Sequence, residues 1–503
     1  QESKRQAVVY HSSASNQDIS QHVLSNVKAG NNITLQANGD ALLRGAQVEA
    51  GNELSLKANG DVKLQAVKDR VLNDASVGQR GGDYFTRYLN DDETVRGSAL
   101  QATGAVTVAA GTNSPNSGKG NILLEGSSVT SQKGAVTVAA EGDLRINDVN
   151  ERHEALAESR ITNVGLFSSK TTDTYTHSIN QQSKGSLVSG ETLNASSGRD
   201  VQITAGTLVG TGDVSLQAKD NVSILSGKET YEAEHYQKVT TSGIFGSGLG
   251  FTIGSRSEKS TLSEQAITQV GSTIGTANGK IAISSGKNTQ VVASDVIGAK
   301  GVDITAGENL KIEAAANNQA VKETYEFKQS GLSVSLGGGL VSGLQSTVNT
   351  VQSAANAKDG RLQALEAWQA GKQLKDLGDK LNGGWANARN DAMNLSISIS
   401  IGSQRLTTQS ESQTKSVRGS VIDGGAGDVN AKAGTGDLNV IASTVIGNNV
   451  KLDAEKGNVN LLAGENTSSE HNSSSSSSAS IGVSIGLKDG FKGGVTPIAS
   501  FSH

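Results

Sequence analysis

A repeat of about 21 residues is the feature that most constrains how this chain can fold. Residues 281–286, IAISSG, recur as residues 302–307, VDITAG, and residues 289–293 recur as 310–314 at the same spacing. Each copy holds three short runs in which apolar and polar residues alternate. A strand with one apolar side must bury that side against neighbouring copies, so a short, fixed period is typical of a solenoid. The repeat predicts an all-β fold, a right-handed parallel β-helix with three strands per coil.

The coil pattern occurs in five blocks of two coils each. In the first block, Val27 recurs as Val48 and Ile33 as Leu54, at the spacing that residues 281–307 show. In the second block, GAVTVAA at residues 104–110 recurs later than this spacing, at residues 134–140, because a loop near residues 112–120 is inserted. We expect residues 1–503 to be one β-helix repeat fragment of a larger protein. The predicted blocks are residues 26–66, 98–148, 186–226, 271–315 and 420–464.

A second kind of segment lies between the blocks and also repeats. Residues 229–232, ETYE, recur as residues 323–326, and a glycine and a strand of small and apolar residues follow each copy. We interpret these segments as β-hairpins extruded from the side of the β-helix, and the alternative is a set of disordered loops. The predicted extrusions are residues 67–97, 149–185, 227–270, 316–419 and 465–503.

One insertion, residues 344–390, changes to a helical period. Leu362, Leu365 and Trp368 recur at three- and four-residue steps, which is the spacing of one helix face. The pattern predicts a helical hairpin that carries both tryptophans of the chain, Trp368 and Trp385. Two interpretations remain open: the helices form a packed cap on the β-helix, or they form a partner-binding knob with these tryptophans as its candidate contacts.

Composition excludes several classes of function. The formal net charge is −5 without long charge runs, so the chain has no electrostatic footprint for nucleic acid. It has no cysteine, which excludes disulfides and thiolate metal sites. Sugar-cleaving β-helix enzymes need a carboxylate pair beside an aromatic platform, whereas aromatics are 3% of this chain and Asp200 and Asp213 fall at turns. We therefore predict that the chain is not an enzyme and has no catalytic residue, cofactor or metal site.

The motifs together resemble a known family. Coils of the form G-x-V-x-I-x-A-G with a G-S-x-I element resemble haemagglutinin repeats. The extrusions, at residues 229–274 and interrupted at 323–402, resemble the second repeat region of filamentous haemagglutinin-like, two-partner secreted exoproteins. Contact-dependent growth inhibition toxins of the CdiA type are the most similar group.

The resemblance implies a secreted filament on the surface of a Gram-negative cell. Its partners would be the flanking domains of the same exoprotein and a cognate outer-membrane transporter that exports it. It would also engage the outer membrane of a target cell, or a surface receptor there, and assist delivery of a C-terminal toxin. The alternative is a passive structural stalk of a haemagglutinin-like adhesin.

The extruded strands themselves indicate a membrane role. Apolar residues occupy every second position, Gly, Ser or Thr lie between them, and charges are nearly absent, which is the pattern that a membrane β-strand requires. In the alternative, which we expect away from a membrane, the hairpins lie flat on the flank of the β-helix and rearrange on membrane contact. The candidate membrane-interaction residues are Leu249, Phe251, Ile253, Leu332, Val334, Leu336, Ile397, Ile399, Ile401, Ile481, Val483 and Ile485.

Overall fold

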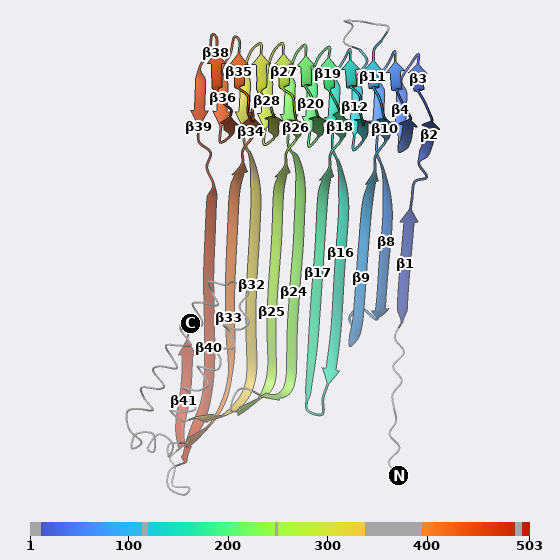
Figure 1. The fold of residues 1–503 in the computed structure, drawn as a ribbon. Helices are drawn as coiled ribbons and strands as arrows, with labels where there is room; N and C mark the ends of the chain where they lie inside the picture. The colour runs from blue at the N-terminus through green and yellow to red at the C-terminus, as the bar shows by residue number, and fades with distance from the viewer. Residues whose placement is uncertain (1–11, 113–118, 247–249, 338–394, 488–494, 503) are drawn as a thin grey trace.

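The computed structural model describes residues 12–112, 119–246, 250–337, 395–487 and 495–502 (Figure 1). All regular elements in these ranges are β-strands, and they form four sheets. The helical hairpin predicted for residues 344–390, with Trp368 and Trp385, lies outside the described residues, as does Leu249.

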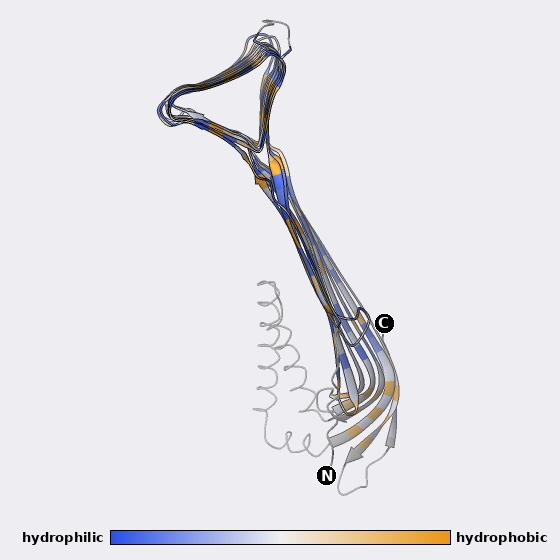
Figure 2. Ribbon diagram, turned by 90° about the vertical axis from the view of Figure 1, so that its right-hand side faces the viewer, coloured by the Kyte–Doolittle hydropathy of each residue, from blue (hydrophilic) through white to orange (hydrophobic). Residues whose placement is uncertain are grey.

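Three sheets of ten parallel strands form the walls of a β-helix, whose cross-section is triangular in Figure 2. The first wall contains β2 (Ser25–Ala29), β5 (Ala46–Ala50), β10 (Ala99–Ala102), β13 (Ser128–Ser131), β18 (Leu187–Gly190), β21 (Thr207–Gly210), β26 (Thr273–Thr276), β29 (Asp295–Gly298), β34 (Val421–Asp423) and β37 (Thr444–Ile446). The second contains β3 (Ile33–Ala37), β6 (Leu54–Ala58), β11 (Val106–Ala110), β14 (Val136–Ala140), β19 (Leu193–Ser197), β22 (Val214–Ala218), β27 (Ile281–Ser285), β30 (Val302–Ala306), β35 (Val429–Ala433) and β38 (Val450–Ala454). The third contains β4 (Ala41–Arg44), β7 (Val62–Gln65), β12 (Ile122–Glu125), β15 (Leu144–Asn147), β20 (Val201–Thr204), β23 (Val222–Leu225), β28 (Thr289–Val292), β31 (Leu310–Glu313), β36 (Leu438–Ile441) and β39 (Val459–Leu462).

The coils stack in the register that the sequence repeat predicts. Ile33 pairs with Leu54, and Ile281 pairs with Val302, each in a parallel ladder. Val302 and Ile304 are fully buried, while Asp303 between them lies outside and accepts a hydrogen bond from an amide side chain of the next coil. Stacking therefore aligns Val, Ile, Leu and Ala into one enclosed apolar column.

Amide side chains form a ladder along the corner between the second and third walls. Asn221 donates through its backbone N and its Nδ2 to Asp200 Oδ1, at 3.0 and 2.9 Å. Asn288 donates in the same way to Asn221, and Asn309 to Asn288. Each coil thus satisfies backbone donors of the next at a corner where strand pairing stops. This geometry supports the turn role predicted for Asp200.

The fourth sheet is antiparallel and leaves the β-helix from one corner (Figure 2). It has eleven strands in the described residues. In order across the sheet they are β1 (Ser13–Ser20), β8 (Val67–Gly78), β9 (Tyr84–Arg96), β16 (Val149–Val164), β17 (Ser168–Lys184), β24 (Gly227–Gly246), β25 (Gly250–Val270), β32 (Ala315–Gly337), β33 (Leu395–Arg418), β40 (Thr467–Leu487) and β41 (Val495–Ser502).

The spacing of coils explains why the hairpins join into one sheet. One hairpin leaves after every second coil. Two coils advance about 9.6 Å along the β-helix, and two antiparallel strands are also about 9.6 Å wide. Successive hairpins therefore meet at strand spacing and pair edge to edge, as β9 does with β16 and β25 with β32. The expected flank-packed arrangement is wrong, because the hairpins satisfy each other's edges and extend away from the β-helix (Figure 2).

Buried serines fix the points where hairpins rejoin the β-helix. Ser272 follows β25, is fully buried, and donates from Oγ to the carbonyl of Leu225 at 2.7 Å. Its backbone N donates to Ser294 Oγ at 3.1 Å, and Ser294 N donates to Ser420 Oγ at the same distance. Ser272 and Ser420 belong to the G-S-x-I motif, so this motif holds the root of the sheet in line with the coils.

Candidate functional site

The strands of the antiparallel sheet lengthen along the chain from β8 to β33. β8 and β9 have 12 and 13 residues, and β16 and β17 have 16 and 17. β24 and β25 have 20 and 21 residues, and β32 and β33 have 23 and 24. The later hairpins therefore reach farther from the β-helix, as Figure 1 shows. We call their distal part the tip, made of residues 243–246, 250–254, 331–337, 395–402, 480–487 and 495–502.

Apolar positions of the tip form continuous rows across neighbouring strands. The pairing register aligns the first row as Ile253, Leu332, Ile401 and Ile481. It aligns the second as Phe251, Val334, Ile399 and Val483, and the third as Leu336, Ile397 and Ile485. Since side chains alternate along a strand, the positions of the first two rows, two residues apart, share one face with Ile397 and Ile485 of the third row. The structure thus brings the eleven described candidate positions together.

The first two apolar rows remain accessible, and Ile397 and Ile485 of the third row are half-buried. The exposed fraction is 41% for Phe251, 58% for Ile401 and 61% for Ile481. In Figure 2, orange apolar segments appear at the lower end of the sheet. The tip residues include no Asp, Glu, Lys or Arg. An exposed, uncharged group of aliphatic side chains on adjacent strands is typical of an interaction surface.

On the central strands of the tip, β25, β32, β33 and β40, the opposite face is built from small and hydroxyl residues, whereas Phe245 on β24 and Ile498 on β41 occupy that face at the two borders. Thr252 pairs with Ser333 and Ser333 with Ser400, and the Thr252 and Ser333 hydroxyls lie 3.0 Å apart. Gly250 pairs with Ser335 in the next row of this face. The central strands of the tip are therefore an amphipathic sheet, apolar on one face and small and polar on the other.

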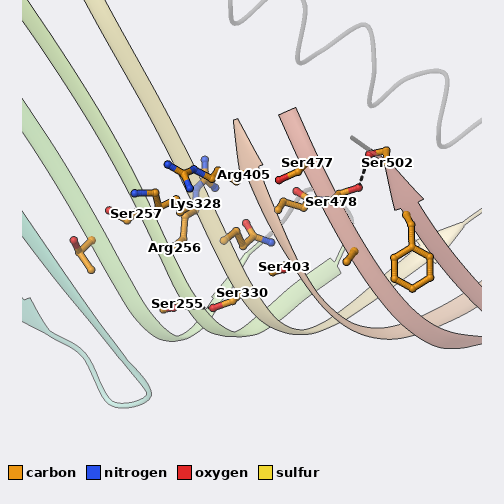
Figure 3. Close-up of a pocket in the computed structure, with 15 residues that line it drawn as sticks. Ser255, Arg256, Ser257, Lys328, Ser330, Ser403, Arg405, Ser477, Ser478 and Ser502 are labelled. Carbon is orange, nitrogen blue, oxygen red and sulfur yellow. Dashed lines mark hydrogen bonds between the residues drawn. The ribbon is translucent and has the colours of Figure 1, made fainter. Parts of the chain in front are cut away.

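A row of glycines crosses the sheet where the tip begins. Gly243, Gly254, Gly331 and Gly402 are aligned on four adjacent strands. Gly243 and Gly331 have φ angles of 99° and 149°, and a Cβ at Gly254 would lie 2.1 Å from the Ser330 carbonyl oxygen. Figure 3 shows the strands bending beside this row. Only glycine permits this close backbone approach, so the row lets the tip turn away from the rest of the sheet.

A cavity of about 830 Å³ lies beside the bend (Figure 3). Ser255, Ser330 and Ser403 line it on adjacent strands, and the Ser255 and Ser330 hydroxyls are 3.1 Å apart. Lys328 and Arg405 line the side away from the tip. The cavity thus combines hydroxyl groups and cations directly next to the first apolar row.

The shorter hairpins have a different surface, dominated by ion pairs. Arg70 donates to both carboxylate oxygens of Asp91 at 2.7 Å, and Arg87 donates to those of Asp74 at 2.9 and 2.8 Å. Hydrogen bonds from Arg70 and Arg87 lower the pKa of Asp91 and Asp74, respectively, below the usual value. Exposed apolar rows on adjacent strands are thus a property of the longer hairpins.

The family model for the Hemagglutinin repeat matches residues 8–83, 77–237, 167–332, 251–375 and 397–503. This chain belongs to the Hemagglutinin repeat family. The predicted resemblance is confirmed, and the chain is a CdiA-type, filamentous haemagglutinin-like region. No solved structure matches the chain.

Several curated relatives carry the name CdiA. The chain is 32% identical over 375 residues to the 16S rRNA endonuclease CdiA of Enterobacter cloacae, which is 71% of this chain and 11% of the relative. It is 30% identical over 412 residues to the deoxyribonuclease CdiA of Dickeya dadantii, 80% of this chain and 12% of the relative. The chain therefore spans about a tenth of these relatives, and their nuclease names describe proteins that are far longer.

Two other kinds of site are absent from the described residues. No helix there is long and apolar enough to cross a membrane. No group of His, Asp and Glu side chains in those same ranges is placed to hold a metal ion.

The sequence predicted the apolar positions of the tip but not their alignment or the bend. Alternation within a strand does not reveal which strand lies next to it. A signal for the bend was present, because a glycine precedes the apolar alternation at Gly243 and Gly331 and follows it at Gly402. These three glycines and Gly254 become one structural row only after the hairpins pair edge to edge.

Proposed function

We propose that this chain is a segment of a secreted, Gram-negative cell-surface filament of a contact-dependent growth inhibition exoprotein. In this role the tip contacts the outer membrane of a target cell and assists delivery of a toxin carried elsewhere in the exoprotein. The segment has no catalytic role of its own, and a cognate outer-membrane transporter exports it with its flanking domains. Family membership and the CdiA relatives support the filament role.

The single observation that carries the membrane role is the set of exposed apolar rows on an uncharged tip. The three rows are spaced by two residues, so they extend over about 13 Å, close to the depth of one leaflet of a hydrocarbon core about 30 Å thick. Ion pairs such as Arg70–Asp91 and Arg87–Asp74 lie on the shorter hairpins, and polar residues alternate with the buried ones along the walls of the β-helix. The tip is thus the part of the described residues best suited to lipid.

The open edges of the tip limit how it enters a membrane. Lipid offers no hydrogen bonds, so unpaired backbone groups at a sheet edge are costly within the hydrocarbon region. Within the described residues the tip has such edges along β24 beyond Gly243 and along β41. We therefore propose that the tip first rests in the interfacial region and enters deeper only when further strands pair with these edges.

The passive stalk remains the second candidate. A stalk needs the β-helix but has no need of apolar rows on a bent, charge-free tip, and this difference favours the membrane role.

A double substitution tests the proposal in the full-length exoprotein. Phe251→Arg with Ile399→Arg places two charges in the second apolar row, and each costs about 2–4 kcal/mol at mid-bilayer. We expect a variant that is folded by circular dichroism, displayed and able to adhere to cells, with toxin entry reduced at least tenfold. A matched control is Leu166→Arg with Phe167→Arg, which changes two exposed apolar residues beside a shorter hairpin. Unchanged toxin entry in the tip variant would contradict the membrane role and favour the passive stalk.

A further inference from the structure

A basic cluster borders the tip on the face that carries the apolar rows. Lys328 on β32 lies directly opposite Arg405 on β33, and we call these two residues the cation pair. Lys259 on β25 lies opposite Glu326 in the adjacent row. Lys328 shares a strand with Leu332, four residues away, so side-chain alternation places both on one face. The cluster is local, because the chain as a whole has a net charge of −5.

Three cations of this cluster surround a single carboxylate. Lys328 Nζ is 3.0 Å from Glu326 Oε2, and Lys259 Nζ is 3.8 Å from Glu326 Oε1. The hydrogen bond from Lys328, with the charges of Lys259 and Arg405, lowers the pKa of Glu326. The Arg405 guanidinium makes no hydrogen bond or ion pair within the described part of the chain. One carboxylate cannot neutralise three cations, and like charges directly opposite each other destabilise a sheet, so the cluster lacks an anion.

Hydroxyl groups complete the surroundings of the cation pair. Ser257 and Ser477 lie opposite the pair on the outer strands, and Ser330 and Ser403 are two residues closer to the tip. The pair and these four serines all line the cavity of about 830 Å³, and Figure 3 labels each of them. Lysine, arginine and hydroxyl donors are the chemistry that recognises a phosphate group, and Glu326 is the acceptor with which a phosphate would share Lys328.

The position of the cavity indicates which phosphate fits it. The row of Ser255, Ser330 and Ser403 lies between the cations and the first apolar row. Lys328 is thus about 13 Å along the strand from Leu332. A membrane has the same order of layers, with charged phosphates at the surface and hydrocarbon below, and basic side chains near the surface are attracted to anionic lipids.

We propose that Lys328 and Arg405, with the hydroxyls of Ser330 and Ser403, bind the phosphate group of an anionic membrane lipid when the tip contacts a bilayer. The lipid source rests on the proposed function, whereas the phosphate chemistry rests on the cluster alone. The bound phosphate supplies the missing anion between two opposed cations and holds the apolar rows at the hydrocarbon boundary.

The test uses the 503-residue chain and two probes of the same headgroup. The first probe is a short-chain phosphatidic acid that stays monomeric in water, with binding measured by calorimetry. The second is a pair of vesicle preparations, phosphatidylcholine with and without long-chain phosphatidic acid, with binding measured by flotation. The variant is Lys328→Gln with Arg405→Gln. Its control, Lys57→Gln with Lys219→Gln, removes the same charge from exposed positions of the β-helix.

We expect the Lys328/Arg405 variant to lose about 30-fold in affinity for the short-chain lipid, because each cation near an anionic surface contributes about a factor of five to ten. It should also lose the preference for phosphatidic acid vesicles while binding phosphatidylcholine vesicles as before. The Lys57/Lys219 control should change by less than about twofold.

Each other outcome decides one part of the proposal. Equal binding of the short-chain lipid by the unmodified chain and the Lys328/Arg405 variant overturns the phosphate site. Short-chain binding without vesicle binding keeps the phosphate site and overturns the membrane contact. Vesicle binding without any preference for phosphatidic acid keeps the membrane contact and overturns the phosphate site. Displacement of the short-chain lipid by an equal concentration of inorganic phosphate would assign the site to free phosphate and overturn the lipid assignment.

Discussion

Aliphatic residues alternate with polar ones both in the β-helix and at the tip of the antiparallel sheet. In the β-helix these aliphatic side chains are buried, whereas at the tip they are exposed. Val302 and Ile304 alternate with polar residues on β30 and are fully buried. Ile399 and Ile401 alternate with serines on β33, and Ile401 is more than half exposed. Coils close into a tube, so their apolar faces meet each other, whereas the tip is one open sheet. The same residue pattern therefore gives a buried core where the coils close into a tube, and an exposed contact surface where the sheet stays open.

The largest effect is expected from a charge placed inside the tube. Ile304→Asp buries a carboxylate without a partner and should lower the free energy of unfolding by about 4 kcal/mol or more. Asp303→Ser, one position away and facing outward, should cost less than about 1 kcal/mol because it removes only a single exposed hydrogen bond. Urea unfolding of both variants checks the difference. Equal destabilisation would contradict the assignment of inside and outside.

A substitution in the amide ladder should have an intermediate effect. Asn288→Ala removes the acceptor for Asn309 and the side-chain donor to Asn221. The backbone N of Asn309 loses its partner at a half-buried corner, so we expect a loss of about 2 kcal/mol. Thermal unfolding measures it, with Gln290→Ala on the neighbouring strand as the control. A loss no larger than that of the control would show that the ladder does not stabilise the tube.

The same chemical change at the tip should affect stability much less. Ile401→Asp introduces the charge of Ile304→Asp at an exposed position, so we expect a cost of about 1 kcal/mol in urea unfolding. Binding to phosphatidylcholine vesicles should nevertheless fall, since the charge interrupts the first apolar row. If Ile401→Asp unfolds the chain as Ile304→Asp does, the tip is a core and the comparison fails.

The smallest effect concerns the ion pairs of the shorter hairpins. Arg70 lowers the pKa of Asp91 in the folded chain, so the paired carboxylate stabilises the fold above the unfolded pKa of about 4. This contribution is lost as pH falls through the lower, folded pKa. Urea midpoints measured at neutral and acidic pH should therefore differ less in Asp91→Asn than in the unmodified chain. An unchanged difference would mean that the pair does not contribute.

Much of the tube could be predicted from the sequence because its contacts repeat at a fixed spacing. Ile33 and Leu54 pair one repeat period apart, and their neighbours match. The partner of Ile253 is Leu332, which follows only after another block of two coils, and no spacing rule connects the two. The apolar rows of the tip form only because successive hairpins pair edge to edge. That pairing requires the advance of two coils along the axis to equal the width of two strands.

The bend was also hidden for a physical reason. Gly254 needs no special φ, and its role depends on the Ser330 carbonyl of the next hairpin, which lies too close for any Cβ. Because the neighbouring strand excludes a side chain at this position, the only sign of the bend in the local sequence is the glycine itself.

The steady lengthening of the hairpins has a consequence for how a long filament meets a flat object. From β8 and β9 to β32 and β33, each hairpin is three or four residues longer than the one before, about 10–13 Å of strand, while its root advances about 9.6 Å along the axis. The outer border of the sheet is therefore oblique, inclined by roughly 50° to the filament axis. A flat partner touches that border along its whole length only when the filament leans toward it. The increase of hairpin length along the chain therefore sets the angle at which the filament approaches a flat partner.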